Sequence, residues 1–416
     1  MRDVVAIDAA LVAARPQALA ALLRYFRDLD TAEEAFQEAC LRALDTWPRN
    51  GPPRDPVAWL IMVGRNRTID GLRKRSRHDP LPDADVLVDP RHGEASLAEQ
   101  LDGADYRDDL LRLLFVCCHP ELPATQQVAL ALRVVAGLPL PQIARAFLVG
   151  ESAMEQRITR SKARIAAADV PFETPGPAER AARLETVAAM LYLLFNAGYT
   201  GVPPGAAHDG RAFCEEAIRL ARLLARLFPA EPEILGLLAL MLLQHAREPA
   251  RRRGDGEAVL LEDQDRALWN RPMIDEGLAL VDAALCRRRP GPYQVQAAIA
   301  ALHDRAPRFA DTDWAEIDQL YATLESLEPS PVVTLNRAVV IERLQGPAAA
   351  LARLEPLAAR LDGYFYFHGV RGAMLQRCGR VAQAREAFNR AIALAGTPEE
   401  ATRMRRYLDH LAAATG

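Results

Sequence analysis

A 34-residue spacing near the C-terminus limits what this chain can fold into more than any other feature of its sequence. Four small or apolar positions recur at that distance: Ala338, Ala350, Leu354 and Leu357 are followed by Gly372, Ala384, Phe388 and Ala391. Such a period is typical of stacked pairs of antiparallel helices, each of which buries its apolar face against its neighbours. We therefore predict a solenoid of helical hairpins in this part of the chain.

The composition favours helices elsewhere as well. Aromatic residues make up only 6% of the 416 residues, and runs of Val, Ile and Thr are scarce. Strands prefer β-branched and aromatic residues, so we predict an all-α protein. A chain of this length exceeds one compact domain, and we expect two or three.

Charge and cysteine usage exclude several classes of protein. The net charge is −4, so any contact with nucleic acid must come from local basic clusters. Lys74 and Lys162, the two lysines, do not follow the pattern of a P-loop ATPase. The longest apolar runs, such as residues 234–243, are about half of the roughly 20 residues that span a bilayer, which argues against a membrane protein. Six cysteines without CxxC spacing, and no signal peptide, indicate the reducing cytoplasm.

Changes in composition divide the chain into domains. Residues 1–78 are predicted to be helical, whereas residues 79–109 are rich in proline and acidic residues and are predicted to form a flexible linker. A second helical domain is expected over residues 110–168. The breaker-rich run 170–177 separates it from the helical repeats, which we place at 178–416.

An acidic helix is predicted in the first domain. Thr31 to Glu34 has the pattern of a capping box and would start a helix over residues 32–44. The apolar spacing leaves Glu33, Glu34 and Glu38 on the solvent side. By itself, an acidic helix face is usually only solvated.

A basic helix follows at residues 59–77. Its second half contains Arg65, Arg67, Arg73, Lys74, Arg75 and Arg77. Clustered basic groups suit phosphate oxygens, although an exposed basic helix end is an equally good explanation. Residues 47–56 between the two helices are predicted to be a proline-stiffened loop. Such a loop could receive an unstacked base beside Trp47. Alternatively, Trp47 is only a side chain packed in the hydrophobic core.

Residues 138–165 have the pattern of a helix-turn-helix. The first helix is expected at 138–147, the turn at 148–151 and the second helix from Ser152, which can cap it, to Ile165. The inward stripe of the second helix is predicted to be Met154, Ile158, Ser161 and Ile165. The outward residues are then mainly Gln156, Arg157, Arg160, Lys162 and Arg164, a face that suits the major groove of DNA.

These segments, in this order, resemble extracytoplasmic-function sigma factors of bacterial RNA polymerase over roughly residues 8–167. The resemblance implies that the coiled coil of the polymerase β′ subunit is contacted by Glu33, Glu34, Gln37 and Glu38. It implies that the flipped base of the minus-ten element is surrounded by Trp47, Arg49, Asn50 and Asn66, with Arg65, Arg67, Arg73 and Lys74 on nearby phosphates. It assigns the minus-thirty-five element to Gln156, Arg157, Arg160 and Arg164. Glu155 and Gly150 depart from the family pattern.

The C-terminal part carries a second resemblance. The strings at residues 191–200, 260–266, 291–299 and 331–337 look like those of the sigma-factor group with a tetratricopeptide-like C-terminal extension. Because the extension is covalently attached, our hypothesis is that it is regulatory: its solenoid surface would bind a regulatory protein or the polymerase, or mask the DNA-binding half. The resemblance implies no catalysis and no cofactor.

Other interpretations remain open. A free-standing helix-turn-helix regulator with a repeat-type sensor domain would share residues 138–165 but would not need the acidic helix. Adjacent Cys117, Cys118 and His119 are poorly placed for a tetrahedral metal site. Glu262, Asp263 and Asp265 lack the histidine partners of a catalytic or metal cluster.

Overall fold

All elements of the described residues are helical, as the sequence predicts. The computed structural model describes residues 2–75, 109, 112–119, 121–147, 149–167, 177–200, 207–252, 259–396 and 398–413. The chain divides into two compact units, which we describe separately. The first comprises Met1–Val202 and His208–Ala217, and the second comprises Pro203–Ala207 and Ile218–Gly416. None of the described helices has the length and apolar content of a membrane span.

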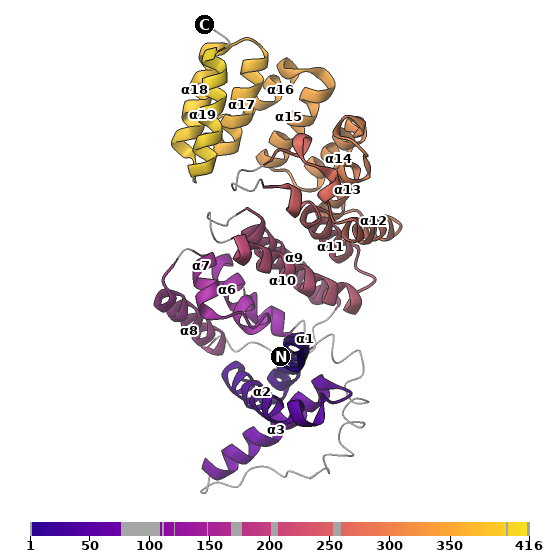
Figure 1. Ribbon diagram of the computed structural model, residues 1–416, viewed down its shortest axis with the longest axis vertical. Helices are drawn as coiled ribbons and strands as arrows, with labels where there is room; N and C mark the ends of the chain where they lie inside the picture. The colour runs from indigo at the N-terminus through magenta and orange to yellow at the C-terminus, as the bar shows by residue number, and fades with distance from the viewer. Residues whose placement is uncertain are drawn as a thin grey trace. The chain divides into compact units, whose positions relative to one another are not determined.

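Three helices form the N-terminal lobe of the first unit: α1 (Arg2–Phe26), α2 (Leu29–Asn50) and α3 (Pro56–Arg75) (Figure 1). Each packs against the other two. The backbones of α2 and α3 approach closely at Gly64, where an added Cβ would lie 2.8 Å from the carbonyl oxygen of Ala35. Only glycine fits at this point without a shift of one helix.

The ends of α2 differ from the prediction. Its N-cap is Asp28, whose side chain accepts a hydrogen bond from the backbone N–H of Thr31 at 2.8 Å, so Thr31 lies inside the helix and is not its cap. At the other end the helix includes Trp47 and Pro48 and stops at Gly51, which has a positive φ of 74°. The predicted loop 47–56 is therefore wrong for residues 47–50, and also for residue 56, where α3 begins. Trp47 lies four residues after the buried Ala43, and burial of that face continues the helix past the proline.

The second lobe of the first unit, the HTH lobe, contains α6 (Ala124–Val134), α7 (Leu140–Ala146) and α8 (Glu151–Ala167). All three pack against one another, and a helical stretch at 112–117 precedes them. The predicted linker 79–109 lies outside the described residues, apart from Asp109. The predicted extension 178–416 begins with α9 (Pro177–Thr200), which packs against α6 and belongs to the first unit.

The second unit consists of helices that pack mainly on their neighbours in sequence. They follow α10 (Ala207–Leu227), which contributes to both units. In order they are α11 (Pro232–His245), α12 (Arg271–Leu285), α13 (Pro292–Arg305), α14 (Trp314–Leu327), α15 (Pro331–Gln345), α16 (Pro347–Leu354), α17 (Phe365–Arg377), α18 (Val381–Leu394) and α19 (Pro398–Ala413).

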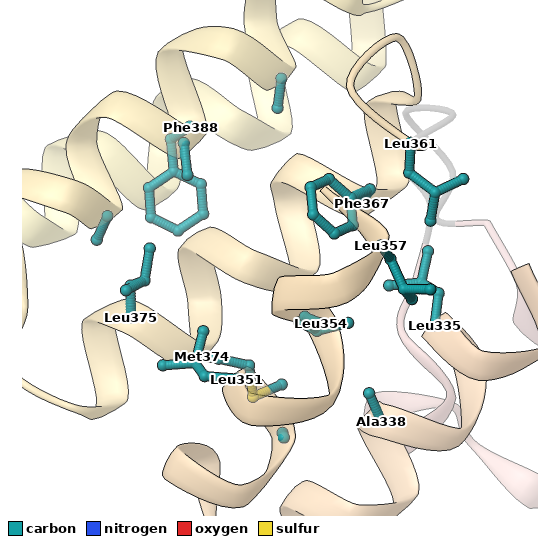
Figure 2. Close-up of a cluster of buried hydrophobic side chains, with 14 of the residues drawn as sticks. Leu335, Ala338, Leu351, Leu354, Leu357, Leu361, Phe367, Met374, Leu375 and Phe388 are labelled. Atoms are coloured by element: carbon teal, nitrogen blue, oxygen red, sulfur yellow. The ribbon is translucent and has the colours of Figure 1, made fainter. Parts of the chain in front are cut away.

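The eight positions with 34-residue spacing are all buried in α15 to α18 and the 3-10 turn after α16. Figure 2 shows the cluster that they join, with side chains from α15, α16, α17 and α18. Gly372 on α17 faces the ring of Phe388 on α18 at a distance that leaves no room for a side chain. A small and a large residue of the 34-residue spacing therefore meet where α17 and α18 approach closely.

Candidate functional site

One face of α2 is exposed and carries predicted site residues. Glu34, Gln37 and Glu38 are all exposed on it. Leu41, one turn further on, is 68% exposed. Spacings of three and four residues place these side chains on the same side of the helix. An acidic face that also exposes a large apolar side chain is better explained as a surface that binds a protein than as a face that only contacts water.

Glu33 does not share this face, and its predicted place on the solvent side is wrong. Its side chain is 9% exposed and accepts hydrogen bonds from Arg15 at 3.5 Å and, closely, from Lys162. On a helix, Glu33 aligns with Phe36 and Cys40, not with Glu34. The Arg15 guanidinium lies over the Phe36 ring at 5.0 Å, so this edge of α2 is covered.

The end of α2 contains the residues predicted for the minus-ten element. Trp47 is 3% exposed and packs edge-on against Trp59, with ring centroids 5.3 Å apart. Its indole Nε1 has no hydrogen-bond partner among the residues that the structure describes. Arg49 is exposed and pairs only loosely with Asp45, at 3.8 Å. The side chain of Asn50 lies outside the described residues.

The second half of α3 contains the predicted phosphate ligands. Arg65 and Asn66 are exposed, and the Arg65 guanidinium lies 4.4 Å from the centre of the Tyr25 ring. The backbone of Arg67, Arg73 and Lys74 continues the helix, but their side chains lie outside the described residues. Arg65 and Asn66 are thus neighbouring exposed residues near the middle of α3.

The buried face of α8, the second helix of the helix-turn-helix, is the one predicted. Its buried residues are Met154, Ile158, Ser161 and Ile165, which confirms the inward stripe. The helix begins at Glu151, so Ser152 lies in its first turn. The prediction that Ser152 is the N-cap is therefore wrong.

The outward face of α8 holds the predicted minus-thirty-five residues. Gln156, Arg160 and Arg164 are exposed at intervals of four residues and form one row, beside the half-buried Arg157. Arg160 Nε donates to the carbonyl oxygen of Gln156 at 3.2 Å, within the helix. These polar and basic groups lie along a single solvent-facing edge, which suits insertion into a groove of DNA.

Arg15 is a site residue that the sequence analysis missed. Its Nε donates to the carbonyl oxygen of Val134 at 2.9 Å and its Nη2 to that of Arg133 at 3.3 Å. These carbonyls are at the C-terminal end of α6, where no intrahelical donor is available. The signal was present in the sequence, because Arg15 is the one charged residue between Asp8 and Arg24.

The electrostatics around Arg15 and Lys162 reflect burial against acidic partners. Burial lowers the pKa of Arg15, although the Glu33 carboxylate acts in the opposite direction. Burial also acts to lower the pKa of Lys162, but hydrogen bonds to Asp30 and Glu33 outweigh it, so the pKa of Lys162 rises. Both groups are cations held by a nearly buried carboxylate.

The cysteines near this site are poor nucleophiles and poor metal ligands. Burial raises the pKa of Cys117 well above its ordinary value and that of Cys118 to about 12. Neutral thiols are weak nucleophiles and metal ligands. Among the described residues, no group of histidine, cysteine and carboxylate side chains is arranged to hold a metal ion.

Comparison with known proteins matches three parts of the chain. Residues 11–78 match Sigma-70 region 2, residues 112–165 match Sigma-70, region 4, and residues 183–285 match a family of unknown function (DUF6596). The chain is also 64% identical, over 415 residues, to a protein of Rhizobium meliloti (strain 1021) named "Uncharacterized protein R00370". The match covers 99% of this chain and 97% of that protein.

The two sigma-70 matches coincide with the two lobes of the first unit. Region 2 covers α2, α3 and most of α1, and region 4 covers α6 to α8 with the helix-turn-helix. The chain therefore belongs to the sigma factor family, whose members direct promoter recognition by RNA polymerase and are not enzymes.

Proposed function

We propose that this sigma factor is of the extracytoplasmic-function type, with a tetratricopeptide-like α-solenoid as a regulatory extension. Residues 79–111 separate the region 2 and region 4 matches. That interval is shorter than the roughly 50 residues of a small domain, so the two regions are joined without a domain between them. This short interval is the observation that carries the proposed type.

Core binding is proposed for the exposed face of α2. Glu34, Gln37 and Glu38 would contact the β′ coiled coil, with Leu41 as an apolar contact among them. Interfaces of this kind combine an apolar centre with charged groups at the rim. Glu33 is included in the proposed contact set, but its carboxylate would first have to leave Arg15 and Lys162.

Recognition of the minus-ten element is proposed for the ends of α2 and α3. Since the Trp47 ring is buried against Trp59, we propose that Trp47 supports the end of α2, while Arg49, Asn50 and Asn66 contact the flipped base. Arg65, Arg67, Arg73 and Lys74 would bind the neighbouring phosphates, releasing counterions.

Recognition of the minus-thirty-five element is proposed for the exposed row of α8. Gln156 and Arg160 would reach base edges, and Arg157 and Arg164 would hold the backbone. A good bidentate base contact contributes about 1–3 kcal/mol of discrimination, whereas phosphate contacts position the helix without reading sequence.

The proposed solenoid extension is supported by the 34-residue spacing and by packing between neighbouring helices in the second unit. Repeats of this kind expose an extended surface suited to a peptide or protein. We propose that a regulatory protein, or the polymerase itself, binds there.

The test is in vitro transcription with purified polymerase core, the full chain and fragmented genomic DNA, followed by sequencing of the transcript starts. Starts that share two spaced upstream elements, and that are lost with Glu34→Lys and Glu38→Lys, would support the proposal. A matched control reverses two exposed acids of the extension, Glu328→Lys and Glu386→Lys, and should retain initiation. Promoter binding by the chain alone, with no need of the core, would instead indicate a free-standing regulator.

A further inference from the structure

An irregular segment between α11 and α12 of the second unit has one exposed side and one buried side. It covers residues 259–270, which we name the strap, and contains two short 3-10 turns. Asp263 and Leu268 are exposed, whereas Arg266 is half-buried and Trp269 is buried. The strap therefore turns basic and aromatic side chains toward the helices that it contacts.

The strap is fixed to the C-terminal ends of α13 and α15. Arg343 Nη2, near the end of α15, donates to the Glu262 carboxylate of the strap at 2.6 Å. Arg266 Nη1 donates to the carbonyl oxygens of His303 at 2.5 Å and of Ala306 at 2.7 Å. The last carbonyls of a helix have no intrahelical donor, so Arg266 stabilises the end of α13. This contact uses one of the two terminal nitrogens of the guanidinium and leaves Nη2.

Two guanidinium groups lie against the ring of Trp269. The guanidinium carbon of Arg266 is 4.4 Å from the ring centre, and that of Arg247, which follows α11, is 5.4 Å from it. Arg247 has a counterion, since its Nε donates to Asp304 Oδ1 at 2.6 Å. Within the described part of the chain, Arg266 has no carboxylate at hydrogen-bonding distance. Two cations therefore share one buried carboxylate.

These contacts bring together four buried polar atoms that lack a hydrogen-bond partner among the residues that the structure describes. They are Arg266 Nη2 and Trp269 Nε1, which are donors, and His303 Nδ1 and Asp304 Oδ2. Trp269 is 4% exposed and Asp304 is 2% exposed. Native proteins leave few buried polar atoms unpaired, so four in one place indicate that water or a ligand completes the site. We name Arg247, Arg266, Trp269, His303 and Asp304 the strap cluster.

The charge of the strap cluster favours an anion over water alone. Burial, and then the charge of Arg247, lower the pKa of Arg266, although Asp304 and the exposed Asp311 act in the opposite direction. Burial and the same two arginines lower the pKa of His303 to about 3, so its imidazole is neutral. Water would satisfy the four polar atoms but would not neutralise the second arginine, and a shielded charge without a counterion is unfavourable. An oxyanion would do both.

We propose that the strap cluster binds a small oxyanion that also carries a hydroxyl group, such as hydrogen phosphate or a hydroxycarboxylate. The anionic oxygens accept hydrogen bonds from Arg266 Nη2 and Trp269 Nε1, and the hydroxyl donates to Asp304 Oδ2. The inference goes beyond the proposed function and does not depend on it, because no residue of the strap cluster is assigned to the polymerase or to the promoter.

The test is hydrogen exchange of the full chain, measured by mass spectrometry over a series of anion concentrations. Its peptides report the strap and residues 303–312 separately from the helices proposed to bind DNA phosphates. Two pairs of anions are compared at constant ionic strength, phosphate with sulfate and hydroxyacetate with acetate. The first member of each pair carries a hydroxyl and the second does not.

We expect phosphate or hydroxyacetate to slow exchange in the strap at concentrations at least about tenfold lower than its matched partner, which lacks the hydrogen bond to a charged acceptor. Protection by phosphate alone would identify a phosphate group as the ligand, and protection by hydroxyacetate alone would identify a hydroxycarboxylate. Absence of protection by all four anions would overturn the proposal and leave ordered water as the partner of the strap cluster. Equal protection by both members of each pair would overturn the hydroxyl contact with Asp304.

Trp269→Phe tests the contact itself, because it keeps a ring beside both arginines and removes only the indole N–H donor. That donor has no partner among the described residues, so exchange without anion and the midpoint of thermal unfolding should change little. The anion concentration for half-maximal protection should rise about tenfold. The matched control is Trp47→Phe, which removes the buried indole N–H of the N-terminal lobe and should leave that concentration unchanged. An unchanged concentration for Trp269→Phe would overturn the proposal.

Discussion

Gly372 faces Phe388 so closely that a Cβ at position 372 would lie 2.6 Å from Cε1 of the ring. The preceding repeat has Ala338 and Leu354 at the same separation of 16 residues, and both join the same buried cluster. The large ring of Phe388 thus requires glycine at position 372. In the preceding repeat the smaller Leu354 is paired with the larger Ala338.

Gly372→Ala should therefore destabilise the second unit, although alanine is the better helix former by up to about 1 kcal/mol. Overpacking costs about 1–3 kcal/mol, so a net loss of about 1 kcal/mol is expected. The double variant with Phe388→Leu recreates the pair of the preceding repeat and should recover part of this loss. Thermal unfolding by calorimetry measures both, and additive losses in the double variant would contradict the pairing.

The exposed row of α8 predicts two kinds of effect on promoter binding by the holoenzyme. Gln156→Ala should lower affinity about 5–150-fold for the preferred minus-thirty-five sequence and much less for altered sequences, as expected for a contact of about 1–3 kcal/mol. Arg164→Gln should weaken binding evenly across sequences and reduce the salt dependence by about one phosphate contact. Binding assays with a series of promoter sequences and salt concentrations distinguish the two effects. If Gln156→Ala lowered the affinity equally for all sequences, Gln156 would not read a base.

The buried pair of Arg247 and Asp304 in the second unit predicts a large effect on stability. Arg247 Nε donates to Asp304 Oδ1 at 2.6 Å, and Asp304 is 2% exposed. Asp304→Asn would leave the Arg247 charge without its counterion and should lower the free energy of unfolding by about 3–5 kcal/mol. Urea unfolding measures the change, with Asp311→Asn, an exposed carboxylate, as the control. A loss below about 1 kcal/mol would show that water replaces the carboxylate.

His303 predicts how stability depends on pH. Burial, and then the charges of Arg247 and Arg266, lower the pKa of His303 to about 3. An unfolded histidine titrates near pH 6.5, so the unfolded chain binds more protons as the pH falls below that value. The stability contributed by neutral His303 is present above about pH 6.5 and should decline by up to roughly 1.4 kcal/mol per pH unit below it.

The measurement for His303 is urea unfolding between pH 7 and 4.5, compared with His303→Gln. Other groups, including Asp304, titrate in both proteins and cancel in the comparison. The unfolding free energy of the unmodified protein minus that of His303→Gln should decrease as the pH falls. A difference that stays constant would contradict the lowered pKa of His303.

The sequence predicts α8 well and α2 less well, for physical reasons that can be named. The buried stripe of α8 follows from helical spacing alone. The end of α2 is harder because Trp47 and Pro48 resemble the start of a loop, while burial against Trp59 keeps them helical. The true cap of α2, Asp28, competes with a good capping pattern at Thr31 three residues later.

The contacts of Arg15 and Lys162 between the two lobes cannot be predicted from the spacing of residues along the sequence. The partners of Arg15 on α6, and those of Lys162 on α2, are more than 100 residues away in the chain, so no local pattern contains them. Helical spacing places Lys162 on the outward face of α8, where most residues are exposed, but it cannot show that Lys162 itself contacts Asp30 and Glu33 of the N-terminal lobe.

The packing of α9 against α6 changes how shortened proteins should be designed. A deletion placed at residues 170–177, where composition suggests a domain boundary, would remove α9 from the same compact unit as the helix-turn-helix. It would also remove the first half of α10, where Cys214 lies against the carbonyl oxygen of Phe195. A fragment ending there would expose an apolar surface of α6. If that fragment failed to initiate transcription, the failure would be due to misfolding of the HTH lobe. Removal of a regulatory extension has to be judged on fragments that keep residues 177–217.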